Sequence, residues 1–127
     1  MPAMPGDVIL IIEDDQQIGG MVAAVLVEAG YQPCLVRDVE AARAEATRGL
    51  APAAVVSDLI VAGSAGPQQL LGELQAIFPS VPVTLMTGVP PKRRAAMGVA
   101  HDHIIEKPFE LDALVRSIAR MVEDQHK

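Results

Sequence analysis

Residues 8–15, VILIIEDD, decide the fold class of this chain. Val8 to Ile12 form an unbroken run of five β-branched and aliphatic residues, which is typical of a strand buried on both faces. Three acids follow directly. Apolar residues then recur at helical spacing as far as Ala29, and Gly30 stands where a helix commonly ends on glycine. The stretch therefore predicts a buried strand that carries acids at its carboxyl end and is followed by a helix.

The same alternation continues to the end of the chain. Further strands are predicted at 33–36, 53–57, 81–86 and 104–105. Further helices are predicted after Asp38, from Pro67, from Pro90 and from Leu111. Five strands alternating with five helices favour right-handed crossovers and a parallel sheet covered on both faces. The predicted fold class is thus α/β, with a doubly wound sheet in three layers.

Length and composition indicate one domain. The chain has 127 residues, of which 50% are apolar, enough for a single buried core. We expect residues 6–124 to form this domain and residues 1–5 and 125–127 to be frayed ends. Met21, Met86 and Met121 are expected to fill gaps in the core.

Charge and residue content argue against several function classes. Sixteen acidic and ten basic residues give a net charge of −6, which disfavours nucleic-acid binding. Cys34 is the only cysteine, so no internal disulfide can form. The start of the chain has no basic segment, and its apolar run is too short for a signal peptide or a membrane span. We therefore expect a cytoplasmic protein with no membrane insertion.

Candidate chemical residues follow the ends of four predicted strands: Glu13, Asp14 and Asp15, then Asp58, Thr87 and Lys107. In an open parallel sheet, ligands bind outside the carboxyl ends of the strands. Converging carboxylates repel one another unless their pKa values rise or a cation binds. Ligands that are all oxygens favour a hard ion such as Mg²⁺ (or Mn²⁺), which commonly binds phosphate oxygens as well. Each residue alone also has a structural interpretation as a turn, cap or strand residue, but their joint placement favours phosphoryl chemistry with Asp58 as the nucleophile.

Four segments carry a resemblance to a known family. IIEDD at 11–15, VVSDLIVAG at 55–63, PVTLMTG at 82–88 and EKPF at 106–109 resemble the signature segments of bacterial response-regulator receiver domains. The resemblance implies a CheY-like (flavodoxin-like) sheet with strand order 2-1-3-4-5. It also implies a phosphoaspartate switch in a two-component phosphorelay, charged from a phosphohistidine on a histidine kinase or a histidine phosphotransfer protein. Such a domain is not an enzyme beyond its own phosphoryl transfer and autodephosphorylation.

The resemblance also implies the ligands of a metal ion. Asp58 matches the phosphoacceptor, which shares the metal with the acidic pair. Within that pair, Asp14 is the more direct ligand and Glu13 often acts through water. Asp15 lies one place beyond the pair and is expected to matter less. Ile60 would offer its backbone carbonyl, so its side chain need not be polar.

Two further residues match groups that contact the phosphoryl group. Thr87 corresponds to the switch hydroxyl that turns inward, and Lys107 to the family's ammonium group. Pro108 would follow Lys107 through a cis peptide bond in most relatives. The chain departs from the family at Ile104, where many receivers have an aromatic residue, so the surface that contacts a downstream partner is undetermined.

Alternative functions follow from the same residues. A receiver-like module that binds partners without phosphorylation would not need the intact acids, Asp58, Thr87 and Lys107. An aspartyl-phosphate phosphatase would carry a second acid where this chain has Ile60. The KPFELDALVRSI segment resembles receivers at the C-terminus of hybrid histidine kinases, but a free single-domain regulator and a homodimer stay open.

Overall fold

The computed structural model describes residues 7–58, 67–87, 104–106 and 111–125. Its elements are β1 (Val8–Ile12), α1 (Gln16–Glu28), β2 (Gln32–Val36), α2 (Val39–Thr47), β3 (Ala54–Asp58), α3 (Pro67–Ile77), β4 (Val83–Thr87), β5 (Ile104–Glu106) and α5 (Leu111–Gln125). The helix expected from Pro90 lies outside the described residues, and so do the expected frayed ends apart from Gln125, the last residue of α5.

The strands form one parallel sheet in the order β2-β1-β3-β4-β5, which is the order that the resemblance implies. β1 lies between β2 and β3, and its residues from Ile9 to Ile12 are fully buried. The chain first adds β2 on one side of β1 and then crosses to β3 on the other side. The strand order therefore reverses beside β1, and ligand sites of open α/β sheets lie at such a point.

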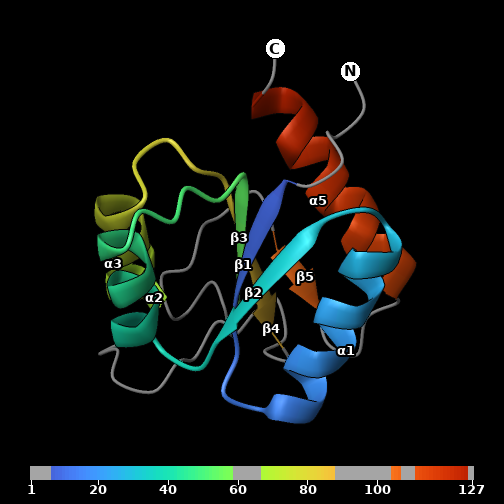
Figure 1. Ribbon diagram of the computed structural model, residues 1–127, viewed down its shortest axis with the longest axis horizontal. Coiled ribbons are helices and arrows are strands. Elements are labelled where there is room, and N and C mark those ends of the chain that lie inside the picture. Colours follow the sequence, from blue (N-terminus) through green and yellow to red (C-terminus); the bar gives the residue numbers. More distant parts are fainter. Residues whose placement is uncertain (1–6, 59–66, 88–103, 107–110, 126–127) are drawn as a thin grey trace.

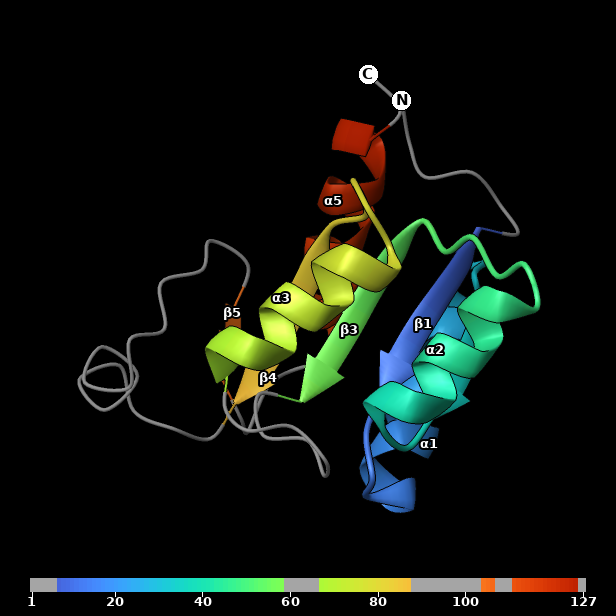
Figure 2. The same ribbon diagram turned by 90° about the vertical axis from the view of Figure 1, so that its left-hand side faces the viewer.

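Helices cover both faces of the sheet (Figure 1). Ile9 and Ile11 of β1 pack in one core with buried residues of α1 and α5, such as Leu26 and Ile118. Leu10 and Ile12 point the other way, into a second core with buried residues of α2 and α3, such as Leu74. Figure 2 shows α2 and α3 together in front of the sheet. Because side chains alternate along a strand, a strand with apolar residues at every position needs both layers.

The helix ends follow from local sequence. The Asp38 side chain accepts a hydrogen bond from the Ala41 amide at 2.8 Å and so caps α2, as predicted. Gly30 and Gly49 follow α1 and α2 with φ of 96° and 100°, a conformation that glycine adopts without strain. None of the helices within the described ranges is both long and apolar enough to cross a membrane.

Two sequence-based expectations are corrected. Met21 is 51% exposed on α1, so its expected core position is wrong, whereas Met86 and Met121 are buried as predicted. The reason is that Val22, the next residue of the helix, points into the core instead. The fourth strand runs from Val83 to Thr87 and not over 81–86, because the Val81 amide still donates to the Phe78 carbonyl in the turn after α3.

Candidate functional site

The acids at the ends of β1 and β3 meet because of the register between these strands. Ile12 pairs with Ser57 across the parallel ladder. Glu13, the first residue after β1, and Asp58, the last residue of β3, therefore lie at the same level. Two segments more than 40 residues apart in the sequence thus deliver their carboxylates to one edge of the sheet, as expected from the sequence.

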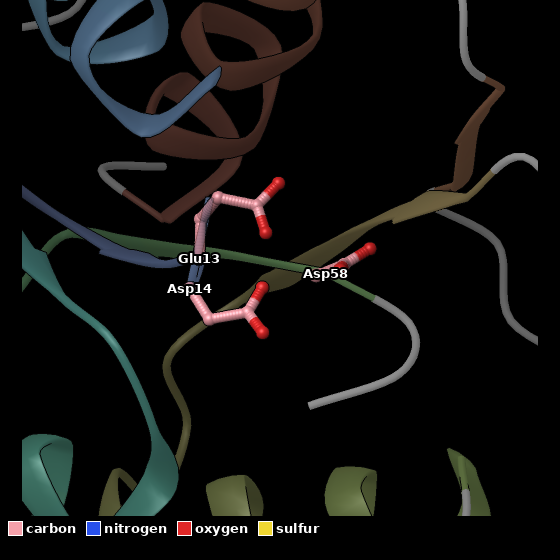
Figure 3. A group of neighbouring side chains, drawn as sticks. All are labelled: Glu13, Asp14 and Asp58. Atoms are coloured by element: carbon pink, nitrogen blue, oxygen red, sulfur yellow. The ribbon is translucent and has the colours of Figure 1, made fainter. Parts of the chain in front are cut away.

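Glu13, Asp14 and Asp58 form one group of carboxylates. One oxygen from each lies within 4.8 Å of the others. Figure 3 shows the Glu13 and Asp14 side chains extending from the end of β1 toward the side on which Asp58 lies. Glu13 is only 3% exposed, Asp58 is half-buried and Asp14 is exposed. The group therefore opens to solvent on the Asp14 side.

The backbone on either side of these acids is fixed by hydrogen bonds. The Glu13 amide donates to the Val36 carbonyl at 3.0 Å, which ties the end of β1 to the end of β2. The buried Ser57 hydroxyl donates to the Asp58 carbonyl at 2.9 Å. Both bonds lie on the backbone that carries the acids, so they restrict where the Glu13 and Asp58 side chains begin.

Asp15 has a different role from its two acidic neighbours. Its side chain caps α1 by accepting hydrogen bonds from the Gln17 amide at 2.9 Å and the Ile18 amide at 3.1 Å. The resemblance assigned it minor importance and said nothing about capping. The signal was nonetheless present in the sequence, since aspartate directly before an apolar helix is a favoured N-cap.

Thr87 ends β4 and is 2% exposed. Asp58 pairs with Met86, so Thr87 lies one position beyond that level on the neighbouring strand. The structure therefore places Thr87 at the same edge of the sheet as the acids. Ile60, Lys107 and Pro108 lie outside the described residues, and their expected roles stay predictions.

The chemistry of the three acids fits a hard divalent cation. Their donors are all carboxylate oxygens, and one from each residue can approach a common point. Such a set suits Mg²⁺ or Mn²⁺ better than zinc, which prefers nitrogen and sulfur ligands. Partial burial strengthens the mutual repulsion of the acids, and a bound cation would remove it.

Comparisons with known proteins agree with this arrangement. The curated nitrogen assimilation regulatory protein NtrX of Azorhizobium caulinodans is 34% identical over 119 residues, which cover 91% of this chain and 26% of NtrX. The chain thus spans about a quarter of that relative's length.

Solved structures share the fold. A response regulator receiver protein from Sinorhizobium medicae superposes with a TM-score of 0.79 at 22% identity, covering 94% of this chain and 97% of that one. The receiver domain of a sensor histidine kinase from Pseudomonas aeruginosa, solved with a magnesium ion coordinated in its active-site cleft, has a TM-score of 0.76 at 24% identity and covers 93% of this chain and 98% of that one. The family model of the response regulator receiver domain matches residues 9–119. The chain belongs to the family of response regulator receiver domains.

Proposed function

We propose that this chain accepts a phosphoryl group on Asp58 from a phosphohistidine and changes conformation in response, and thereby controls a partner protein. The donor is a histidine kinase or a histidine phosphotransfer protein. One observation carries the proposal: in a chain of the receiver family, the Glu13, Asp14 and Asp58 carboxylates converge within 4.8 Å at the carboxyl edge of the sheet.

Asp58 is the nucleophile in this proposal. A carboxylate oxygen attacks the phosphorus of the donor, the phosphorus–nitrogen bond breaks, and the imidazole nitrogen keeps the electron pair. The product is an acyl phosphate on Asp58, which water later hydrolyses to free phosphate and the original carboxylate. Asp58 suits this role because it is half-buried at the end of β3, with its backbone carbonyl held by Ser57.

Asp14, Glu13 and Asp58 would hold Mg²⁺ (or Mn²⁺), and by resemblance the Ile60 carbonyl would join them. A cation bound there would offset the charge of the carboxylates and of the incoming phosphoryl oxygens, which otherwise repel each other. The magnesium ion in the Pseudomonas aeruginosa receiver domain supports this assignment by analogy.

Thr87 and Lys107 would contact the phosphoryl group. A hydroxyl donor and an ammonium group both stabilise negative charge on phosphoryl oxygens. Thr87 is buried at the end of β4, the strand next to β3. By resemblance, its hydroxyl would turn inward to the phosphoryl group on Asp58. We propose this reorientation as the first step of the conformational switch.

The proposal covers residues 6–124 as one switch domain in the cytoplasm, without nucleic-acid contact of its own. It describes stoichiometric phosphorylation and autodephosphorylation, not turnover of an external substrate.

The test is phosphorylation by a small donor. The chain is incubated with acetyl phosphate and Mg²⁺, and intact mass spectrometry is expected to show the gain of one phosphoryl group. Hydroxylamine should remove it, because an acyl phosphate is cleaved by this nucleophile. Asp58→Asn should abolish the gain, whereas Asp15→Asn, an identical change in an acid that caps α1, should retain it.

Two outcomes would contradict the proposal. A mass gain that persists in Asp58→Asn would place the phosphoryl group elsewhere. Continuous release of phosphate, far beyond one equivalent and without an accumulating phosphoprotein, would instead indicate an aspartyl-phosphate phosphatase.

A further inference from the structure

Asp14 is exposed, although it belongs to the carboxylate group. An exposed side chain is not held in place by packing, so the position of its carboxylate depends on the direction of its own backbone. The neighbouring residues therefore decide how well Asp14 is aimed at Asp58.

Both neighbours of Asp14 are anchored. On one side, the Glu13 amide is bonded to the Val36 carbonyl of β2 at 3.0 Å. On the other side, Asp15 has an extended backbone, with φ −80° and ψ 107°, and its side chain accepts from the Gln17 and Ile18 amides. Asp14 is thus the single residue between two fixed points.

The helix that anchors Asp15 is itself held tightly. The Asp15 carbonyl accepts from the Gly19 amide at 2.9 Å, the first helical hydrogen bond of α1. Gly19 in turn packs so closely on β2 that a Cβ atom there would lie 2.8 Å from Leu35 Cδ1. The first turn of α1 is therefore both hydrogen-bonded to Asp15 and packed against β2.

We propose that Asp15 is a positioning residue for the metal site: its capping hydrogen bonds hold the Asp14 backbone so that the Asp14 carboxylate meets Glu13 and Asp58. This inference rests on the metal binding in the proposed function. Without the cap, the Gln17 and Ile18 amides lose their acceptor, and the turn before the helix gains freedom. Asp14 then spends less time in the geometry that binds a cation.

The experiment measures Mn²⁺ binding to the whole chain by the electron paramagnetic resonance signal of the free ion, with Mg²⁺ as competitor. Asp15→Ala should raise the dissociation constant about three- to tenfold, somewhat less than the ~10–100-fold typical when a group bonded directly to a ligand is lost. Asp15→Ser and Asp15→Asn remove the charge but keep a capping acceptor, and both should bind Mn²⁺ within about twofold of wild type.

A further variant separates positioning from stability. Gly20 lies on the exposed side of α1, and apart from its chain neighbours and the helix's own backbone no atom lies within 4 Å of the methyl group that Gly20→Ala adds. This substitution therefore stabilises the helix without restoring the cap. Asp15→Ala/Gly20→Ala should therefore bind Mn²⁺ as weakly as Asp15→Ala. Circular dichroism confirms that each variant is folded at the measuring temperature.

Each result decides between explanations. If Asp15→Ala and Asp15→Ser weaken Mn²⁺ binding equally, Asp15 acts only through its charge. If Asp15→Ala/Gly20→Ala regains wild-type Mn²⁺ affinity, the weakening in Asp15→Ala comes from a loss of general stability. Either result overturns the positioning role, as does wild-type affinity in Asp15→Ala. Failure of the wild-type chain to bind Mn²⁺ would instead refute the metal site itself, and with it the inference.

Discussion

Replacing Asp14 by serine is expected to raise the free energy of unfolding of the metal-free protein. The Asp14 carboxylate lies within 4.8 Å of one oxygen each from Glu13 and Asp58. At that distance two like charges repel by roughly 0.9 kcal/mol in a water-like dielectric and by roughly 3.5 kcal/mol at an effective dielectric constant of about 20. Because Asp14 is exposed, the lower figure applies. Two pairs, reduced by screening at physiological salt, amount to about 1 kcal/mol.

The same substitution should abolish stabilisation by Mg²⁺. A cation at ten times its dissociation constant stabilises the folded protein by about 1.4 kcal/mol. The wild-type protein should show this gain, and Asp14→Ser should not. The matched control is Asp15→Ser, which removes one carboxylate from the adjacent residue. Since serine also caps a helix, the unfolding free energy of Asp15→Ser should fall by no more than about 0.5 kcal/mol, and its stabilisation by Mg²⁺ should remain.

The assay is urea denaturation followed by far-ultraviolet circular dichroism, because the chain has no tryptophan. Each protein is unfolded after treatment with a chelator and again with added Mg²⁺, at low and at physiological salt. Without metal, the increase in unfolding free energy caused by Asp14→Ser should become smaller as the salt concentration rises. A loss of metal-free stability in Asp14→Ser, or an undiminished response to Mg²⁺, would refute the repulsion and the ligand role of Asp14.

Three further predictions concern the fold. Burial raises the pKa of Tyr31 above its ordinary value of 10.0. Since Tyr31 is the only tyrosine, the tyrosinate absorbance of the folded chain should appear at higher pH than that of the chain unfolded in urea. The free energy of unfolding should fall as pH rises past that ordinary value, because the folded state holds the proton more tightly. Coincident titrations in both states would contradict this. The fully buried Thr84 hydroxyl donates to the Met121 thioether at 2.7 Å, so Met121→Leu should cost about 1–3 kcal/mol of unfolding free energy. Adding Thr84→Val should recover most of that loss in a double-mutant cycle, and strictly additive effects would exclude the bond. In calorimetry, Gly20→Ala should raise the free energy of unfolding by up to about 1 kcal/mol. Gly30→Ala, at φ of 96°, should lower it by about 1 kcal/mol. Equal effects of the two substitutions would argue against these backbone conformations.

The order and type of the described elements follow from the sequence. The apolar run from Val8 to Ile12 and the helical spacing after it depend on neighbours within one element, and both appear as predicted. The cap at Asp38 and the glycines after the helices are also local signals. Local periodicity was less informative for single side chains, since Met21 next to Val22 is apolar but exposed.

The candidate site was predicted only in part from local sequence patterns. The sequence by itself determined that acids stand at the carboxyl ends of β1 and β3, because a buried strand ending in charged residues can be recognised from its own residues. It also pointed to Thr87 at the end of the next strand, although the strand bounds had to shift to include it.

The tertiary structure decided which of the three consecutive acids reach Asp58. Glu13 and Asp14 meet Asp58 because Ile12 pairs with Ser57 across two strands that are distant in the sequence. Asp15 turns instead to the amides of α1. Neighbouring acids look alike in a sequence, but strand register and the start of a helix place their side chains in different surroundings. The cap at Asp15 is local, but the meeting with Asp58 depends on the pairing of β1 with β3, which neither strand encodes alone.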